Sequence, residues 1–299
     1  MRLADFIVIG APKAGTTTLY EYLARHPGVF MTDPKEPEFF AKPDRLALGM
    51  DWYAGLFANA RPDQKAGEAS TAYANYPKVP GVAPRIAQAM PHVRLIYLLR
   101  EPVSRTYSFY AQEIKNRQRA GEFPDGPPSF EERAAQTRYY VDSSDYQLQI
   151  EQYLAHFPRE QLLVEVFEEF VADPAAALRR VLEFIGVDPA VDLMAQGEVA
   201  TNTAAEHVER YTRNVLAQRM RSWPLVGGAR RLVPNAVRRA TLEALRRTPL
   251  GKRAERVVRT PPMKPETRRE LTAYFAAKRP ALEALLGRSL SIWDKPRRA

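Results

Sequence analysis

Short apolar runs alternate with segments of helical periodicity along most of the first 190 residues. The clearest runs cover 6–9, 93–99 and 161–166, and each predicts a buried strand. The segments 17–25 and 102–119 carry apolar side chains at helical spacing, and a turn or a proline bounds each of them. Strands that alternate with helices in this way are typical of a parallel sheet with helices on both faces. We therefore expect an α/β fold.

The same pattern predicts further elements in this part of the chain. Helices are expected at 51–58, 84–90, 145–157 and 174–185. The segment 67–73 is rich in small residues and is interpreted as a stretch between turns. The segment 35–40 is expected to be an ordered, non-helical loop, because Pro34 and Pro37 exclude a helix there. Its paired Phe39 and Phe40 predict an aromatic anchor behind two charged residues.

Beyond about residue 200 the pattern is helical and basic. Helices are expected at 204–222, 234–247 and 264–286, separated by Gly- and Pro-containing breaks. We expect these helices to form a basic appendage, about 200–299, on an α/β core of about 1–190. The organisation predicted from the sequence is thus a single domain spanning 1–299.

The net charge of +9 is unevenly distributed. Residues 201–299 contain 23 Lys and Arg against 8 Asp and Glu, a balance of +15, whereas residues 1–200 contain 21 and 27, a balance of −6. This asymmetry indicates an anionic partner for the C-terminal third, with a membrane surface or nucleic acid as candidates. A solvated basic face on amphipathic helices is an equally good interpretation.

Composition excludes several kinds of chemistry. The chain has no cysteine, and its four histidines lie far apart without metal-ligand spacing. Disulfides, thiolate nucleophiles and a metal site are therefore not expected. The first apolar run is short and lacks a basic, cleavable leader, so the sequence favours a cytoplasmic protein.

The first candidate site follows the first apolar run. Gly10 and Gly15 bracket a tight turn that leads into Thr16-Thr17-Thr18 and a helix. Such a turn offers free backbone N–H groups and the positive end of a helix dipole to a phosphate. Nucleotide phosphate loops normally carry Lys directly after the second Gly, where this chain has Thr16. The predicted anion ligands are Lys13, Ala14, Gly15, Thr16, Thr17 and Thr18.

The second candidate site lies at the end of the run 93–99. Nucleotide triphosphatases usually have an acidic, magnesium-binding residue there, but this chain has Arg100. Ser108 follows eight residues later, two turns into the next helix. An arginine with a hydroxyl suits a second phosphate bound without metal. The alternative interpretation is an arginine that caps a helix.

The third candidate site is the segment 35–40. Glu36 lies near the predicted phosphate loop, between prolines and aromatic anchors, and could act as a general base. The alternative is a surface loop with ordinary charges.

Taken together, these residues resemble sulfotransferases that use 3′-phosphoadenosine 5′-phosphosulfate (PAPS). The Pro-Lys-x-Gly-Thr-Thr turn at 12–17 is similar to the family's 5′-phosphosulfate loop, and Arg100 with Ser108 is similar to its 3′-phosphate motif. The segment Lys-Glu-x-x-Phe-Phe at 35–40 resembles the one that carries the catalytic glutamate in the heparan-sulfate branch and in bacterial relatives. The resemblance covers roughly 5–187.

The resemblance implies a role for each of these residues. Lys13 would stabilise charge on the leaving 3′,5′-bisphosphate (PAP), and Arg100 with Ser108 would select the 3′-phosphate. Glu36 would take a proton from an acceptor hydroxyl or amine as it attacks sulfur in line. The expected acceptor is a carbohydrate, lipid or secondary metabolite, without any metal or nucleic acid. A peripheral membrane contact through the basic helices is an additional expectation.

The chain departs from the family pattern in two places. Heparan-sulfate-type members carry Glu-Lys-Ser/Thr where this chain has Glu68-Ala69-Ser70. The family's Gly- and Lys/Arg-rich cofactor loop near the C-terminus has no clear counterpart, although 202–213 or 227–231 could replace it. The acceptor is therefore not specified by the resemblance.

Two other functions remain open from the sequence. A small-molecule kinase with an aberrant phosphate loop would bind ATP and magnesium better than PAP. A non-enzymatic protein that binds membranes or nucleic acid through 204–259 would show strong salt dependence.

Overall fold

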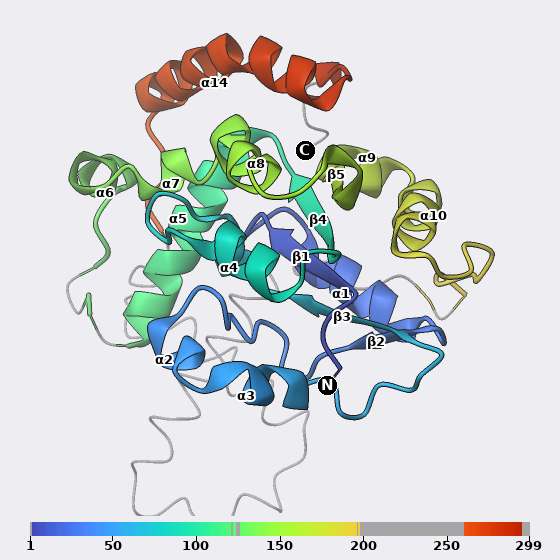
Figure 1. Ribbon diagram of the computed structural model, residues 1–299. Coiled ribbons are helices and arrows are strands. Elements are labelled where there is room, and N and C mark those ends of the chain that lie inside the picture. Colours follow the sequence, from blue (N-terminus) through green and yellow to red (C-terminus); the bar gives the residue numbers. More distant parts are fainter. Residues whose placement is uncertain (1, 121, 124–125, 196, 198–259, 295–299) are drawn as a thin grey trace, which may run out of the picture. The chain divides into compact units, whose positions relative to one another are not determined.

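The computed structural model describes residues 2–120, 122–123, 126–195, 197 and 260–294 (Figure 1). The chain divides into two compact units. The first comprises 1–110, 131–199 and 263–299 and contains every strand of the described chain. The second comprises 111–130 and 200–262. Its described part includes the second half of one long helix, Pro102–Arg119. The helices predicted at 204–222 and 234–247 lie outside the described residues.

A five-stranded parallel sheet forms the centre of the first unit. The strands are β1 (Phe6–Gly10), β2 (Val29–Met31), β3 (Lys65–Ala69), β4 (Arg94–Leu99) and β5 (Leu162–Val166). Their order across the sheet is β2-β3-β1-β4-β5, and all neighbouring pairs are parallel. The chain therefore moves to one side of β1 for β2 and β3, and to the other side for β4. Parallel α/β sheets bind ligands outside the carboxyl ends of the strands at such a reversal.

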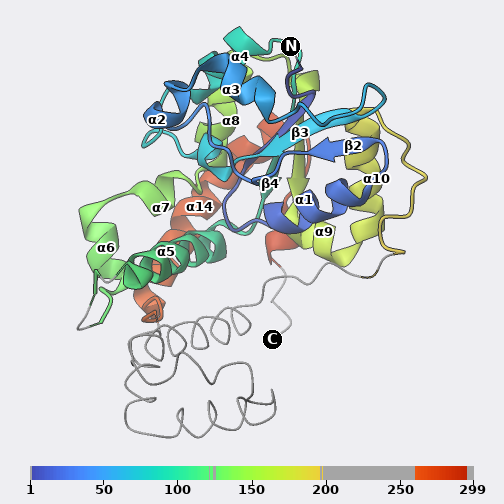
Figure 2. The same cartoon turned by 90° about the horizontal axis from the view of Figure 1, so that it is seen from below.

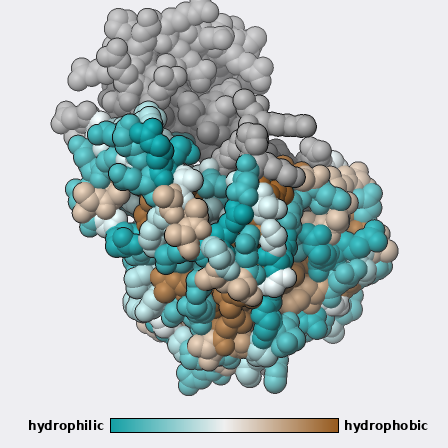
Figure 3. All heavy atoms as spheres, turned by 90° about the horizontal axis from the view of Figure 1, so that it is seen from above, coloured by the Kyte–Doolittle hydropathy of each residue, from teal (hydrophilic) through white to brown (hydrophobic). Residues whose placement is uncertain are grey.

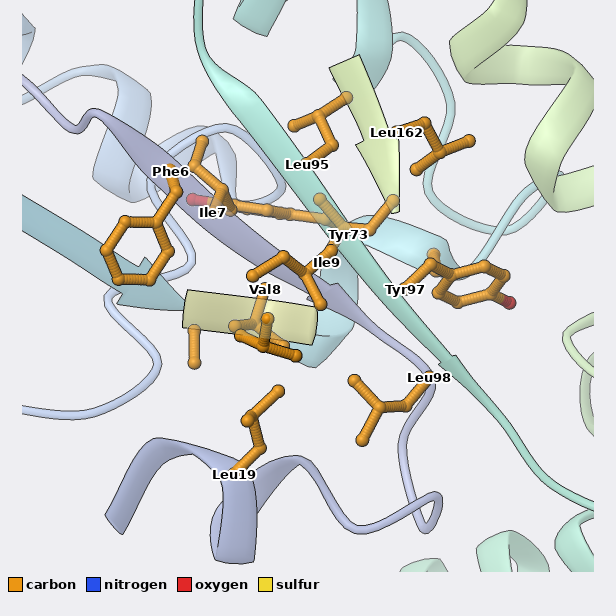
Figure 4. Packing of buried hydrophobic residues seen from close by; sticks show 14 of the residues in the cluster. Phe6, Ile7, Val8, Ile9, Leu19, Tyr73, Leu95, Tyr97, Leu98 and Leu162 are labelled. Atoms are coloured by element: carbon orange, nitrogen blue, oxygen red, sulfur yellow. The ribbon is translucent and has the colours of Figure 1, made fainter. Parts of the chain in front are cut away.

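The predicted strands form because both faces of this sheet are covered. All five residues of β1 are buried, and in β4 only the first residue is exposed. Continuous apolar runs are typical of strands buried on both faces. Figure 4 shows Ile7, Val8 and Ile9 of β1 among Leu19 and the β4 side chains of Leu95 and Leu98.

The interpretation of 67–73 as a stretch between turns was wrong, because its first residues belong to strand β3 and its last to a 3₁₀ turn. The strand escapes the pattern because it lacks large apolar residues. A Cβ on Gly67 would lie 2.2 Å from the Phe6 ring, so the core selects glycine here in place of a β-branched residue. The small residues of β3 thus make room for side chains of its neighbour.

Helices cover both faces of the sheet. Helices α1, α9 and α10 lie on one side and α4 and α8 on the other (Figure 2). The helices are α1 (Thr16–Arg25), α2 (Pro43–Leu46), α3 (Gly49–Gly55), α4 (Val82–Ala89), α5 (Pro102–Arg119), α6 (Phe130–Gln136), α7 (Tyr139–Asp142), α8 (Tyr146–Leu154), α9 (Phe167–Ala172), α10 (Pro174–Ile185) and α14 (Pro265–Leu286). The described residues also contain three 3₁₀ turns, η1 (Thr71–Ala74), η2 (Arg159–Gln161) and η3 (Ser291–Asp294).

The predicted helix boundaries agree closely with these elements where local signals mark them. The Asp173 side chain caps α10 by accepting from the Ala176 amide at 3.0 Å, and Gly186 ends the helix with φ of 78°. α5 matches the predicted range 102–119. α4 begins at Val82, two residues earlier than predicted from Pro84. Residues 130–142 contain α6 and α7, which the sequence pattern did not predict.

The helix predicted at 264–286 is α14, and it belongs to the same compact unit as the sheet. Lys278 of α14 forms an ion pair with Asp145, the residue that caps α8. Figure 3 shows the face on the α14 side, where most coloured side chains are hydrophilic. Within the described residues, no helix has the length and apolar character needed to span a bilayer.

Candidate active site

The loop between β1 and α1 has the backbone geometry of an anion site. The Ala11 amide donates to the Leu98 carbonyl at 2.9 Å, which holds the start of the loop beside β4. Gly15 has φ of 90°, and a Cβ there would lie 2.7 Å from the Phe167 ring, so a side chain does not fit. α1 begins at the next residue, with no acidic side chain in its first turn. The amides of that turn lack partners within the helix, and together with the helix dipole they have the geometry that suits an anion.

Lys13 occupies a strained position in this loop. Its φ is 68°, in the left-handed region, which costs a non-glycine residue on the order of 1–2 kcal/mol. The Lys13 carbonyl accepts from Arg100 Nη1 at 2.9 Å, and the Ala14 amide closes the turn on the Ala11 carbonyl at 3.2 Å. The unfavourable conformation is therefore held by contacts on either side.

The three threonines of the first turn differ in exposure. Thr16 is buried, while Thr17 and Thr18 are half-buried. Lys35 Nζ donates to Thr17 Oγ1 at 3.2 Å and to Glu36 Oε1 at 2.9 Å. Lys35 thus connects the predicted phosphate loop directly to the segment that carries the predicted base.

Two arginines join the segment after β4 to the same loop. Arg100 lies with its Cζ 5.2 Å from the centroid of the Phe167 ring, in addition to its bond to the Lys13 carbonyl. Arg105 is fully buried, and its Nε donates to the Pro12 carbonyl at 2.9 Å. Its Nη1 donates to two serine hydroxyls before α8, at 2.8 and 2.9 Å. The first two candidate sites therefore form one continuous structure.

The backbone at the end of β4 is also fixed. The Tyr146 hydroxyl donates to the Arg100 carbonyl at 2.7 Å and accepts from the Arg100 amide at 3.2 Å. Ser108 is half-buried in the second turn of α5. Its role beside Arg100 as a ligand of a second phosphate stays a prediction.

Glu36 lies in the third segment and has both a cation and a hydroxyl beside its carboxylate. Thr71 Oγ1 donates to Glu36 Oε2 at 3.2 Å, while Lys35 pairs with the other oxygen. The Glu36 amide donates to the Ala69 carbonyl at 3.0 Å, at the end of β3. About a third of the Glu36 side chain (34%) is exposed, so the carboxylate is both positioned and accessible.

The aromatic anchor predicted behind Glu36 is confirmed. Phe39 and Phe40 are each 2% exposed, and their ring centroids lie 5.0 and 5.1 Å from that of Tyr53. The segment 35–40 is therefore not an ordinary surface loop. Its paired rings are part of the core, and this fixes the backbone that presents Glu36.

A buried carboxyl lies behind this anchor. Glu68 of β3 is completely buried and accepts hydrogen bonds from the hydroxyls of Tyr53, Ser70 and Tyr73 at 2.8, 2.7 and 3.0 Å. Burial raises the pKa of Glu68 to about 7, even though the three hydrogen bonds lower it. Burial, and then Glu68 itself, raises the pKa values of Tyr53 and Tyr73, so both hydroxyls remain donors.

This raised pKa predicts how stability depends on pH. Between pH 4.5 and about 7 the native state keeps a proton on Glu68 that the unfolded chain releases. The free energy of unfolding contributed by this group therefore falls as pH rises, by on the order of 3 kcal/mol across the window. Glu68→Gln stays neutral, so its stability relative to wild type should increase from pH 5 to pH 8 in urea unfolding experiments. An unchanged difference between the two proteins would contradict the expected titration.

Three residues of the site had no assigned role in the sequence interpretation. Arg105 and Lys35 act through contacts with residues far away in the chain, namely Pro12 and Thr17. The sequence gives one sign of Glu68, since it is a carboxylate within a run of small residues. The spacing of the tyrosines in the sequence does not show that they bind it.

Comparison with known proteins agrees with this architecture. Residues 3–243 match the model of a family described as "Sulfotransferase domain". A crystal structure of a sulfotransferase from Alicyclobacillus acidocaldarius aligns over 99% of this chain and 100% of its own, with a TM-score of 0.65 and 27% identity.

Two characterised relatives are animal enzymes. Heparan sulfate glucosamine 3-O-sulfotransferase 3B1 of Mus musculus is 34% identical over 195 residues, covering 62% of this chain and 47% of that protein. The bifunctional heparan sulfate N-deacetylase/N-sulfotransferase 3 of Homo sapiens is 32% identical over 204 residues, covering 63% of this chain and 23% of that protein. The match thus spans less than half the length of either relative. Because the family model covers most of the chain and the strand–loop–helix geometry agrees with it, the chain belongs to the sulfotransferase family.

Proposed function

We propose that this protein transfers a sulfuryl group from PAPS to a hydroxyl or amine, with Glu36 as the general base. The observation that carries the proposal is that the segment after β4 and the segment 35–40 both contact the loop between β1 and α1. Arg100 binds the Lys13 carbonyl, and Lys35 connects Thr17 to Glu36. Cationic groups, an anion-binding helix terminus and a carboxylate are therefore assembled at the carboxyl ends of β1, β3 and β4.

The residues at this loop fit the nucleotide donor. The α1 N-terminus and Lys13 would hold the 5′-phosphosulfate, with contacts from residues 14–18. Arg100 and Ser108 would hold the 3′-phosphate, a group that ATP lacks. The end of β4 has a cation where triphosphate-binding enzymes have a magnesium-binding acid. These residues therefore favour PAPS over a nucleoside triphosphate. Arginine is well suited to a phosphate because its donors match two oxygens at once.

The chain's own residues would divide the chemistry among them. Glu36 would take the proton from the acceptor as its oxygen or nitrogen bonds to sulfur and the bond to the bisphosphate breaks. Lys13 would balance the negative charge that develops on the departing bisphosphate. Lys35, bonded to Glu36 and Thr17, would keep the base aligned with the sulfuryl group.

We propose a carbohydrate as the acceptor class. One relative described above is named a heparan sulfate glucosamine 3-O-sulfotransferase, and the other a heparan sulfate N-deacetylase/N-sulfotransferase. A lipid or a secondary metabolite acceptor is the alternative. Incubation with sulfur-labelled PAPS and either heparan sulfate oligosaccharides or a cell extract of small metabolites separates these classes.

The binding of PAP and ADP tests whether the proposed donor is PAPS. PAP at about 100 times its Kd should raise the free energy of unfolding by about 2.7 kcal/mol, and ADP, which lacks the 3′-phosphate, should do less. Arg100→Ala should weaken PAP binding about 10- to 100-fold, because it removes a charged hydrogen-bond donor. Calorimetric titration of wild type and Arg100→Ala with PAP and ADP measures these effects.

Arg94 provides the matched control at the other end of β4. It also donates to a backbone carbonyl, that of Phe184 at 2.6 Å, and lies against the Phe184 ring. Arg94→Ala should leave PAP binding unchanged. Stronger stabilisation by ATP with magnesium than by PAP would instead support the kinase interpretation and reject this proposal.

A further inference from the structure

We propose that Glu68 is a positioning residue that holds the segment 36–40 in its active conformation through the hydroxyls of Ser70 and Tyr73. The inference rests on the proposed function, because it assigns the geometry of the segment that carries the proposed base. Glu68 itself lies behind the aromatic anchor and is completely buried, so it does not meet the acceptor.

Two short hydrogen-bond chains run from this carboxylate to the backbone of the segment. In the first, Ser70 Oγ donates to Glu68 Oε2 at 2.7 Å and accepts from the Glu38 amide at 3.0 Å. In the second, the Tyr73 hydroxyl donates to Glu68 Oε1 at 3.0 Å and accepts from the Phe40 amide at 3.3 Å. One carboxylate therefore anchors two backbone amides that are two residues apart.

The ionised carboxylate determines the direction of both chains. A carboxylate only accepts, so the hydroxyl protons of Ser70 and Tyr73 point toward Glu68, and their lone pairs face the backbone amides. A protonated carboxyl must itself donate to one of its neighbours, and a hydroxyl that receives this proton must turn its own proton elsewhere. Ionisation of Glu68 thus favours the arrangement that binds the segment.

The segment needs such support because its backbone is strained. Glu36 and Glu38 have φ of 62° and 52°, both in the left-handed region. The Glu36 amide is bound to the Ala69 carbonyl, immediately after Glu68 in β3. Residues 68–73 thus fix the amides at positions 36, 38 and 40 in turn.

Groups from several elements face Glu68 and influence its charge. They are Tyr53 of α3, Tyr73 of η1, Tyr153 of α8 and Glu38, which forms an ion pair with Lys42. Burial raises the pKa of Glu68 to about 7, and Glu38 contributes to the increase. Near neutral pH the carboxyl is therefore divided between its two forms, and the order of the segment should depend on pH.

Two tyrosines form a matched pair for the test. Tyr53→Phe and Tyr73→Phe each remove one hydroxyl donor from Glu68 Oε1 and keep the ring, but only the Tyr73 hydroxyl also accepts from a segment amide. Tyr73→Phe should speed hydrogen exchange at the Phe40 amide and lower kcat by about tenfold, with KM for PAPS unchanged. The Tyr53 hydrogen bond also lowers the pKa of Glu68, so the two variants are compared at pH 9, where the carboxyl is ionised and Tyr53→Phe should lower thermal stability alone. Equal exchange rates and equal kcat in the two variants would overturn the proposal.

Glu68→Gln gives a second, pH-dependent measurement. In wild type, kcat for sulfation of heparan sulfate should include a rise through about pH 7 as Glu68 ionises. Glu68→Gln should lose that rise while still binding PAP, and retention of the wild-type profile would count against the assignment. If wild type transfers no sulfate from PAPS to any acceptor, the proposed function fails, whereas the exchange comparison still decides whether Glu68 orders the segment.

Discussion

Lys13→Met is expected to lower kcat for sulfuryl transfer by about 10³-fold, because a cation positioned at a developing negative charge is among the largest single contributions to catalysis. Methionine keeps an unbranched side chain of similar length and removes the charged ammonium group with its hydrogen-bond donors. The Lys13 carbonyl, which binds Arg100, is unaffected, so the loop should keep its shape. Single-turnover experiments with labelled PAPS measure the chemical step separately from binding.

Lys65 is the control for this substitution. It lies at the first residue of β3, at the opposite end of the sheet from the loop, so Lys65→Met removes an equal charge without approaching the site. We expect its turnover to match wild type. If Lys13→Met also kept the wild-type single-turnover rate, Lys13 would have no part in stabilising the leaving group.

Glu36→Gln is expected to lower kcat by about 10²- to 10⁴-fold while PAP binding is retained. The amide cannot take the acceptor proton, and its single oxygen can accept only one of the two hydrogen bonds that Lys35 and Thr71 donate to the carboxylate. The loss should therefore appear in kcat and not in the affinity for nucleotide. Calorimetry with PAP and steady-state kinetics with the glycan acceptor separate the two quantities.

Glu38 offers a closely matched control two residues away. Its backbone is also left-handed, with φ of 52°, and its carboxylate pairs with Lys42. Glu38→Gln should therefore retain most of the turnover. If Glu36→Gln and Glu38→Gln lowered kcat equally, the assignment of the base to Glu36 would have to be abandoned, although the proposal of sulfuryl transfer would stand.

The strands that could be predicted from sequence are those whose surroundings demand large apolar side chains. β1 and β4 are buried on both faces, and a continuous run of apolar residues in the sequence indicates such a strand. β3 is equally central but could not be found this way. Its composition depends on the Phe6 ring over Gly67 and on the tyrosines around Glu68. Phe6 and Tyr53 are distant in sequence, and nothing in the local pattern shows that the nearby Tyr73 hydroxyl reaches Glu68.

In the candidate site, too, local features could be predicted from the sequence, and contacts between distant residues could not. The turn between β1 and α1 and the segment after β4 could be found from the sequence because turn, helix start and charge lie within a few residues of one another; their role in binding phosphate stays a prediction. The connection made by Lys35 could not be found in this way, since Thr17 lies eighteen residues earlier and meets it only after α1 and the loop have folded. The burial of Arg105 likewise depends on serines about forty residues later in the chain.

The left-handed conformations at Lys13 and Glu36 also bear on how this protein could be engineered. At positive φ, glycine or asparagine would relieve backbone strain. Both residues proposed to do the chemistry therefore occupy positions where a more stable protein could be obtained by removing them. Selection for thermostability alone would favour loss of the two residues that activity requires, a local trade-off between stability and activity. Libraries built for stability should keep both positions constant.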